Sequence, residues 1–308
     1  MTDGDAIFTD RLCKQYGSRR VLQDLSLRVG MGELFGFLGP NGAGKTTTIR
    51  IIMGLLRATS GVARLLGGDA WGDGPRLRAG VGYLPGDVRF YDTISGRRTM
   101  DFFDHARGGT HGEEARRLTQ VFDLELDKPV RSYSRGMKQK LGLIVAMMHK
   151  PKLLVLDEPT TGLDPLVREA LYRELRAVAG DGRTVLFSSH TLSEVEELCD
   201  EVAIVRSGRL IEQEKISVLR QRAVRHVEVQ FATSDAPAPP SGLTTISQSA
   251  LALRATWAGE VSPLIEWLSR CKVSDVSIAP PDLEDLFLAY YSRHDSQSEQ
   301  PARAEPTR

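Results

Sequence analysis

Residues 34–47 read Leu34-Phe-Gly-Phe-Leu-Gly39-Pro-Asn-Gly-Ala-Gly44-Lys45-Thr46-Thr47, a short apolar run followed by a glycine-rich turn. The residues that follow, Thr47–Leu56, have helical spacing. A glycine-rich turn between a strand and a helix matches a phosphate-binding loop, in which glycines let backbone N–H groups point at phosphate oxygens. Lys45 adds a positive charge, and Thr46 adds a hydroxyl suited to Mg²⁺. The stretch therefore predicts a phosphate-binding site built on a strand, a loop and a helix.

Residues 6 to about 215 alternate short apolar runs with longer amphipathic stretches, a pattern typical of α/β layering. The strands expected from short runs between turn signals are Ala6–Leu12, Val21–Val29, Leu34–Leu38, Leu153–Leu156 and Thr184–Phe187. Two other stretches, Gly96–Arg107 and Glu113–Phe122, have helical spacing and predict a helical insert. We therefore expect an α/β nucleotide-binding domain over residues 1–218.

The composition changes after residue 215, and we expect a second, compact α+β module over residues 222–291. Residues 236–242 form a loop by composition, and the expected strands are Val227–Phe231, Ala250–Trp257 and Val273–Ile278. One helix is expected to begin at Ser262-Pro263, and a second to run from Asp282 to about Tyr291. The polar residues 292–308 contain almost no apolar side chains, which predicts a disordered tail.

The charge balance argues against a function based on a strongly basic surface. Of the 308 residues, 40 are Lys or Arg and 40 are Asp or Glu, so the formal net charge is +0 and nucleic acid is not an expected partner. Apolar runs such as Leu141–Met148 are much shorter than the roughly 18–20 residues that cross a bilayer. The start at Met1 lacks the pattern of a signal peptide, and three isolated cysteines are typical of reduced thiols. We therefore expect a cytosolic protein.

Three polar side chains follow two of the expected strands. Asp157 and Glu158 come directly after Leu153–Leu156, and His190 comes shortly after Thr184–Phe187. The carboxyl ends of parallel strands meet at one edge of a sheet, where open α/β sheets bind their ligands. One carboxylate there suits a Mg²⁺ shell, and the other suits polarising an attacking water. For His190, a phosphate contact and a purely structural role are equally compatible with the spacing.

Two further motifs lie before and after these carboxylates. Tyr133-Ser134-Arg135-Gly136-Met137-Lys138-Gln139 precedes the helical run Lys140–Met148, and Thr161-Gly162-Leu163-Asp164-Pro165 follows the carboxylates. In this order, and with Tyr16 near the start, the motifs resemble the signature loop, D-loop and adenine-stacking aromatic of ABC transporter ATP-binding subunits. The resemblance covers residues 6 to about 215. It implies a P-loop NTPase (RecA-like) core with an antiparallel β subdomain and a helical subdomain at about 88–150.

The resemblance also implies ATP and Mg²⁺ as cofactors and ATP hydrolysis as the activity. The residues that it places on ATP are Tyr16, Gly39, Pro40, Asn41, Gly42, Ala43, Gly44, Lys45, Thr46 and Thr47, with Ser134 and Gly136 acting on the ATP of a facing subunit. Thr46 and Asp157 would hold the metal, Glu158 would be the general base, and His190 would contact the γ-phosphate. Two such subunits, identical or different, would close head to tail around two ATP molecules.

Two positions depart from the family pattern. Gly86, in Gly82-Tyr83-Leu84-Pro85-Gly86-Asp87, stands where the family usually has a glutamine that touches Mg²⁺ and relays the nucleotide state to the membrane partner. Either Asp87 or an ordered water replaces that contact, or the coupling is altered. Arg135 stands where signature loops usually have a second glycine. Its guanidinium either neutralises charge on the facing nucleotide or points to solvent.

The segment Pro280-Pro-Asp-Leu-Glu-Asp-Leu-Phe-Leu-Ala-Tyr290 resembles the closing segment of ATPases that partner ABC-2 type permeases, although an ordinary capped helix has the same pattern. The resemblance implies a separate permease, powered by dimer closure, that exports a drug, antibiotic or other small hydrophobic molecule. That permease is expected to dock on residues 89–103, and the ATPase subunit is therefore expected at the cytoplasmic face of the membrane. For single residues such as Phe90 and Tyr91, a plain surface or core role is equally compatible with the sequence.

Two other functions have to be weighed against the exporter hypothesis. A soluble ABC-class ATPase acting on nucleic acid or the ribosome would carry a long coiled-coil insertion or a second ATPase core, and the sequence shows neither. A small-molecule kinase also uses a phosphate-binding loop, but it leaves the signature loop and the D-loop unexplained.

Overall fold

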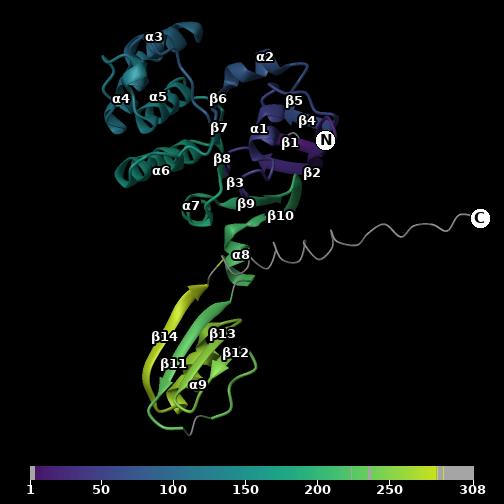
Figure 1. The fold of residues 1–308 in the computed structure, drawn as a ribbon, viewed down its shortest axis with the longest axis vertical. Helices are drawn as coiled ribbons and strands as arrows, with labels where there is room; N and C mark the ends of the chain where they lie inside the picture. Colours follow the sequence, from purple (N-terminus) through teal and green to yellow (C-terminus); the bar gives the residue numbers. More distant parts are fainter. Residues whose placement is uncertain (1–3, 223, 235–236, 282, 284–286, 288–308) are drawn as a thin grey trace, which may run out of the picture. The chain divides into compact units, whose positions relative to one another are not determined.

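The computed structural model describes residues 4–222, 224–234, 237–281, 283 and 287 and is drawn in Figure 1. Its internal contacts divide the chain between Glu214 and Lys215 into two compact units. Among the described residues, no helix combines the length and the apolar composition that crossing a membrane requires.

The first unit is built on a six-stranded sheet in the order β10-β9-β3-β8-β7-β6. The strands are β3 (Leu34–Leu38), β6 (Val81–Leu84), β7 (Leu153–Asp157), β8 (Thr184–Ser189), β9 (Glu201–Arg206) and β10 (Arg209–Lys215). Strand β3 pairs in parallel with β8 and β9, and β7 pairs in parallel with β6 and β8. Every residue of β3, β7 and β8 is buried, as expected for apolar strands covered on both faces. The carboxyl ends of these three strands therefore lie side by side.

A second sheet in the same unit has the order β2-β1-β4-β5. Its strands are β1 (Asp5–Tyr16), β2 (Arg19–Gly30), β4 (Ser60–Leu65) and β5 (Gly68–Asp69), and neighbouring strands pair antiparallel. Apolar side chains of this sheet, such as Ile7 and Leu25, share one hydrophobic core with Phe35 of β3 and Ile49 of the helix α1 (Lys45–Ile52). The antiparallel sheet thus packs against the side of the helix that follows the glycine-rich loop, as Figure 1 shows.

The other described helices of this unit are α2 (Gly74–Leu77), α3 (Gly96–Ala106), α4 (Gly112–Val121), α5 (Arg135–Met147), α6 (Pro165–Gly180) and α7 (Leu192–Leu198), with 3₁₀ turns η1 (Arg78–Gly80) and η2 (Val130–Ser132). Helices α3, α4 and α5 contact one another and lie together in Figure 1. The side chains of Ser95, Ser134 and Asp164 cap α3, α5 and α6 by accepting backbone N–H groups. Parallel sheet, antiparallel sheet and helices together confirm the expected α/β fold class.

Two helices differ in their limits from the expectation. Helix α1 ends at Ile52 and not at Leu56, because Gly54 adopts a φ of +63° and a side chain there would collide with the carbonyl oxygen of Ala70. Helix α5 begins at Arg135, five residues before the expected start, because Ser134 caps it.

The second unit contains a four-stranded sheet in the order β12-β13-β11-β14. Its elements are α8 (Ile216–Arg222), β11 (Arg225–Phe231), β12 (Leu243–Gln248), β13 (Ala252–Trp257), α9 (Val261–Arg270) and β14 (Val273–Pro281). Side chains of α9, including Trp267, pack on β11 and β13 to form the core of this unit. Strands β11, β13 and β14 and helix α9 confirm four expected elements. Strand β12 was not predicted, because it is an edge strand whose residues after Leu243 are all exposed.

The end of the chain is described at two positions. Leu283 and Phe287 are helical and buried, with exposed fractions of 0 % and 4 %. The rest of the helix expected between Asp282 and Tyr291, and the tail expected over 292–308, lie outside the described residues.

Candidate active site

The glycine-rich loop between β3 and α1 is held by close backbone contacts. Gly39 is buried, and a side chain there would collide with the carbonyl oxygen of Val205 on β9. Gly44 has a φ of +104°, which favours glycine, and a Cβ would approach Leu22 Cδ2 to 2.6 Å. The carbonyl of Ala43 accepts the N–H of Gly208 at 2.9 Å. The loop conformation therefore depends on contacts with both sheets.

Lys45 is the first residue of α1, and its side chain folds back over the loop. The ammonium donates to the carbonyl oxygens of Gly39 at 2.6 Å and of Pro40 at 3.3 Å, and the side chain is only 5 % exposed. Helix α1 has no side-chain cap, so the N–H groups of its first turn point toward the loop. A helix N-terminus beside a buried ammonium is a strongly anion-binding arrangement.

Asp157 ends β7 and is fully buried. Its Oδ1 accepts the hydroxyl of Ser188 at 2.8 Å, whereas Oδ2 is buried with no hydrogen-bond partner among the described residues. A Cβ on Gly86 would lie 3.2 Å from that oxygen, so a side chain at position 86 would crowd it. Burial and then the charge of Asp157 raise the pKa of Tyr83 to about 12, so this neighbouring phenol stays neutral. A buried carboxylate oxygen that lacks a hydrogen-bond donor among the described residues fits a magnesium ligand.

Glu158 lies between two cationic or protonatable groups. Its Oε1 is 3.4 Å from the ammonium of Lys45, and its Oε2 is 3.4 Å from Nδ1 of His190. The backbone of Glu158 has a φ of +50°, a conformation that L-residues rarely adopt and that is frequent at functional sites. Its N–H donates to the carbonyl of Ser188, and its own carbonyl accepts from the side chain of Gln139.

A cavity of about 400 Å³ lies over the glycine-rich loop and reaches Lys45 and Glu158. Of the expected residues, it is lined by Tyr16, Pro40, Asn41, Gly42, Gly44, Lys45, Thr46, Thr47 and Glu158. Tyr16 is half exposed, and the ammonium of Lys14 lies 5.0 Å from the centre of its ring. Arg19 and Val21 also line the cavity, although the sequence did not single them out. The pairing of Tyr16 with Arg19 across the β1–β2 hairpin accounts for the position of Arg19.

Other expected residues lie outside the lining of this cavity. Gly39, Ala43 and Asp157 are buried, and His190 is half exposed beside Glu158. Ser134 is exposed at the start of α5, where its hydroxyl accepts the N–H of Met137 at 3.2 Å. Gly136 packs on the carbonyl of Gly162 so closely that no side chain fits between them. A single chain therefore does not bring Ser134 and Gly136 into the lining of its own cavity.

Asp87 does not face the buried carboxylate site. It forms an ion pair with Arg89 at 2.6 Å, and its side chain is 67 % exposed. Of the two replacements considered for the missing glutamine contact, the geometry disfavours Asp87, because its carboxylate is already engaged at the surface.

These features define a P-loop nucleotide-binding domain: a glycine-rich loop, a buried lysine at a helix start, and a carboxylate pair at the end of the adjacent strand. The ABC transporter family profile matches residues 22–161. The chain is 36 % identical over 231 residues to the bacitracin transport ATP-binding protein BcrA of Bacillus licheniformis, covering 73 % of this chain and 74 % of that protein. It is 32 % identical over 305 residues to the daunorubicin resistance ATP-binding protein DrrA3 of Streptomyces coeruleorubidus, covering 92 % and 95 %.

A solved structure of the ATP-binding subunit of an ABC transporter superposes with a TM-score of 0.65 at 31 % identity, covering 70 % of this chain and 92 % of that one. The chain belongs to the ATP-binding subunits of ABC transporters, in the branch that contains these antibiotic transport and resistance proteins. Members of this family hydrolyse ATP to power transport, and the chain is such an ATPase.

Proposed function

We propose that this ATPase powers a separate ABC-2 type permease that exports a drug, antibiotic or other small hydrophobic molecule. The expected class of cargo rests on the relatives, which are named for bacitracin transport and daunorubicin resistance. The proposed chemistry rests on Glu158, which lines the cavity together with Lys45 and whose carboxylate lies 3.4 Å from both the Lys45 ammonium and Nδ1 of His190.

ATP binding is assigned to the residues that line or support the cavity. Lys45 and the loop N–H groups hold the β- and γ-phosphates, since they combine a buried positive charge with a helix N-terminus. Tyr16 stacks on adenine, and the nearby Lys14 ammonium restricts its ring. Arg19 adds a positive charge at the mouth of the same cavity.

Magnesium is assigned to Oδ2 of Asp157 and the hydroxyl of Thr46. Asp157 fits this role because Oδ2 is buried without a donor among the described residues and because the glycine at position 86 carries no side chain that would crowd this oxygen. Ser188 fixes the other carboxylate oxygen and so orients the group. The metal, when bound, neutralises charge on the β- and γ-phosphates.

Glu158 is assigned as the general base. Its carboxylate takes a proton from the attacking water, which forms a bond to the γ-phosphorus as the bond to the β–γ bridging oxygen breaks, giving ADP and phosphate. His190 contacts the γ-phosphate and, through Glu158 Oε2, holds the base in place. Lys45 limits the motion of the same carboxylate through Oε1.

Completion of the site is assigned to a second subunit. Ser134 and Gly136 lie outside the cavity of their own chain, and the exposed Ser134 hydroxyl stands at the start of α5. We propose that two chains, identical or different, close head to tail so that each signature loop covers the other's phosphates.

The permease is proposed to dock in a second cavity of the same unit, called here the docking groove. Its volume is about 380 Å³, and it is lined by residues after α1 (Met53, Leu55), by β6 and the segment that follows (Tyr83, Val88, Phe90), and by α3 and α5 (Phe103, Val145). Because Gly86 of the same segment borders Asp157, a partner in the groove contacts a chain segment that reaches the proposed metal site.

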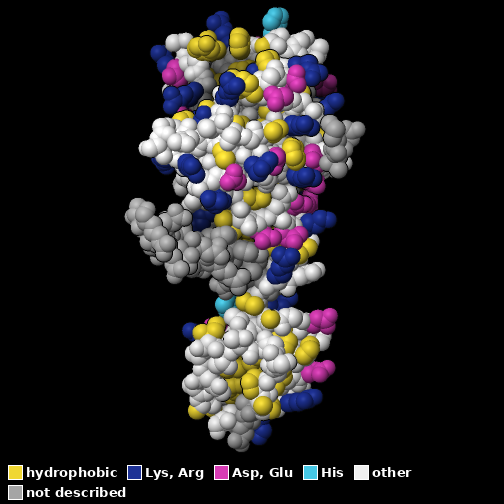
Figure 2. Space-filling model, turned by 90° about the vertical axis from the view of Figure 1, so that its right-hand side faces the viewer, with side chains coloured by type: hydrophobic (Ala, Val, Ile, Leu, Met, Phe, Trp, Pro, Cys, Tyr) yellow, Lys and Arg dark blue, Asp and Glu magenta, His cyan; other side chains and the backbone are white. Residues whose placement is uncertain are grey.

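The alternative, an ATPase acting on nucleic acid, is not favoured. On the face of the first unit drawn in Figure 2, Lys and Arg side chains are interspersed with Asp and Glu and do not gather into one basic patch. Nucleic-acid binding usually depends on such a patch.

Purification of the tagged chain from gently solubilised membranes tests the proposal, with bound proteins identified by mass spectrometry. We expect a stoichiometric partner with several membrane spans at the cytoplasmic face. Recovery with ribosomes or DNA instead would contradict the exporter function and leave the ATPase chemistry intact.

A further inference from the structure

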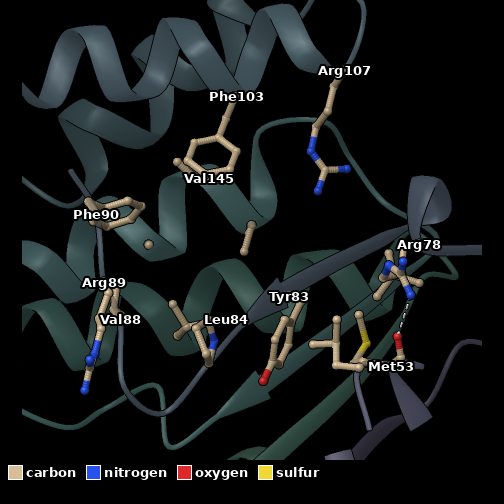
Figure 3. A pocket seen from close by; sticks show the side chains of 15 residues that line it. Met53, Arg78, Tyr83, Leu84, Val88, Arg89, Phe90, Phe103, Arg107 and Val145 are labelled. Atoms are coloured by element: carbon tan, nitrogen blue, oxygen red, sulfur yellow. Dashed lines mark hydrogen bonds between the residues drawn. The ribbon is translucent and has the colours of Figure 1, made fainter. Parts of the chain in front are cut away.

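The docking groove contains three arginines, of which one lacks a partner among the described residues. Arg78 donates to the carbonyl of Met53 at 3.1 Å, as the dashed line in Figure 3 marks, and Arg89 pairs with Asp87. Arg107, just after α3, lines the groove, and its guanidinium makes no hydrogen bond or ion pair with the described residues, whereas its backbone N–H donates to the carbonyl of Asp104. In Figure 3 its side chain points down from α3 toward the cavity.

The acidic side chain in the last turn of α3 is already engaged. Asp104 accepts both the N–H of His111 and the ring nitrogen Nδ1 of His111 at 2.9 Å. Among the described residues, the charge of Arg107 therefore has no counter-ion. Burial lowers the pKa of the Arg107 guanidinium, and burial together with the charge of Arg107 lowers the pKa of His149 to about 4. A half-buried cation without an anion is costly, since its desolvation is not compensated.

The rest of the groove is mainly apolar. Phe103 of α3 precedes Arg107 by about one helical turn, and Val145 lies beside Phe103 in Figure 3, whereas Leu84 and Met53 lie on the opposite side of the groove. A volume of about 380 Å³ is within the range of specific binding cavities. In the described structure the groove thus combines apolar side chains with one cation that has no counter-ion, and Phe103 and Arg107 are four residues apart, at the end of α3.

We propose that the docking groove recognises a segment of the membrane partner that carries an apolar side chain and an Asp or Glu three or four residues away. The apolar side chain packs against Phe103 and Val145, and the carboxylate pairs with Arg107. This inference rests on the proposed function, because the partner is the permease, and it adds the chemistry by which the partner is chosen. Because the positive charge of Arg107 attracts a carboxylate, the groove should bind an acidic segment in preference to a basic or purely apolar one.

Photo-crosslinking in cells tests the inference on the full chain. Leu55 is 52 % exposed and lines the groove, so benzoylphenylalanine at this position reports on whatever occupies it. After irradiation, the crosslinked peptide is sequenced by mass spectrometry. We expect a segment of a protein with several membrane spans, with Asp or Glu three or four residues from an apolar side chain that faces the groove.

Charge reversal then tests the ion pair. We expect Arg107→Glu to lower the crosslinking yield by about tenfold, Arg107→Lys to retain most of it, and replacement of the partner's acidic residue by Arg to restore it in the Arg107→Glu background. Arg98→Glu is the matched control, because Arg98 lies on the exposed side of α3. Circular dichroism and thermal unfolding check that each variant folds, and Arg107→Gln replaces Arg107→Glu if the latter does not.

Two results would overturn the inference alone: a membrane segment without an acidic residue, or a yield that does not respond to the charge at position 107. A crosslink to a ribosomal or DNA-bound protein would instead contradict the proposed function. The two failures are therefore distinguishable in one experiment.

Discussion

Gln139 donates its side-chain N–H to the carbonyl of Glu158 at 3.2 Å and to that of Pro159 at 3.0 Å. Gln139 belongs to α5, the helix that begins at the signature loop, whereas Glu158 follows β7. The glutamine is 4 % exposed, and Glu158 has a positive φ. These two hydrogen bonds therefore connect helix α5 to the backbone that positions Glu158, the proposed base.

Replacing Gln139 by Leu removes this connection at nearly constant volume. The two carbonyl oxygens lose their donor, which costs about 1–2 kcal/mol, and a loss of this size in the transition state lowers the rate by about five- to thirtyfold. We expect ATP affinity to stay within about twofold, because Gln139 does not line the nucleotide cavity. Gln120→Leu, on the exposed side of α4, is the control. Equal losses of ATP affinity and turnover would contradict a positioning role.

Replacing Glu158 by Gln is expected to abolish ATP turnover and to preserve ATP binding. The amide has nearly the same shape as the carboxylate but cannot accept the proton of the attacking water. The variant should therefore accumulate as a closed, ATP-bound dimer, visible by size-exclusion chromatography with light scattering. Phosphate release close to that of the unaltered protein would remove Glu158 from the role of base. Lys45→Ala serves for comparison, since it is expected to weaken nucleotide binding itself.

Replacing Ser134 by Ala tests whether this residue contacts the ATP of its own chain or the ATP bound to the facing chain. Ser134 is exposed and does not line the cavity of its own chain. We expect lower hydrolysis with unchanged ATP affinity of the isolated subunit, as measured by equilibrium binding at a protein concentration that keeps it monomeric. A loss of affinity in the monomer would argue against the head-to-tail dimer. Loss of the cap on α5 is also expected to lower the free energy of unfolding by about 1 kcal/mol.

Replacing Gly86 by Ala probes the space next to the proposed magnesium ligand. The new Cβ would stand 3.2 Å from Oδ2 of Asp157, closer than ordinary van der Waals contact. We expect half-maximal ATP binding to require several times more Mg²⁺, while binding of ATP without the metal changes little. Gly112→Ala is the control, since nothing lies within 4 Å of its added Cβ. An unchanged Mg²⁺ requirement would show that this space is not used by the metal and its waters.

His149 is expected to make stability depend on pH below neutrality. Burial, and then the charge of Arg107, lower its pKa from 6.5 to about 4 in the folded chain. The unfolded chain therefore binds the proton more readily, and stability is lost as pH falls from about 6.5 toward 4. With allowance for partial exposure of the ring, the loss is about 1–2 kcal/mol. In the His149→Leu variant, the urea concentration at the unfolding midpoint should fall less steeply as the pH is lowered over this range. The same dependence on pH in the variant and in the unaltered protein would contradict the role given to His149.

The glycine-rich loop and the strands around it could be predicted because their signals are local. Gly39 to Thr46 have a fixed spacing, and fully buried strands such as β7 appear in the sequence as continuous apolar runs. Strand β12 could not be predicted in this way. It is held at the sheet edge by pairing with β13, while its own side chains are mostly exposed and polar.

Long-range contacts were equally invisible in the sequence. Gln139 could be quoted as part of a motif, but its two acceptors lie about twenty positions away and are reached only by packing of α5 beside β7. Arg19 enters the nucleotide cavity only because the β1–β2 hairpin places it opposite Tyr16. The missing partner of Arg107 likewise depends on where other helices direct their acidic residues.

Helix α1 joins the two cavities of the first unit. Lys45 at its start lines the nucleotide cavity, and Met53, directly after its end, lines the docking groove. With eight residues the helix is only about 12 Å long. If occupancy of the groove shifts this helix, the two binding equilibria are linked, and linkage is reciprocal: a partner that tightens ATP binding by a given factor is itself bound more tightly by the same factor when ATP is present. The permease would then act as an effector of the ATPase as much as the ATPase drives the permease.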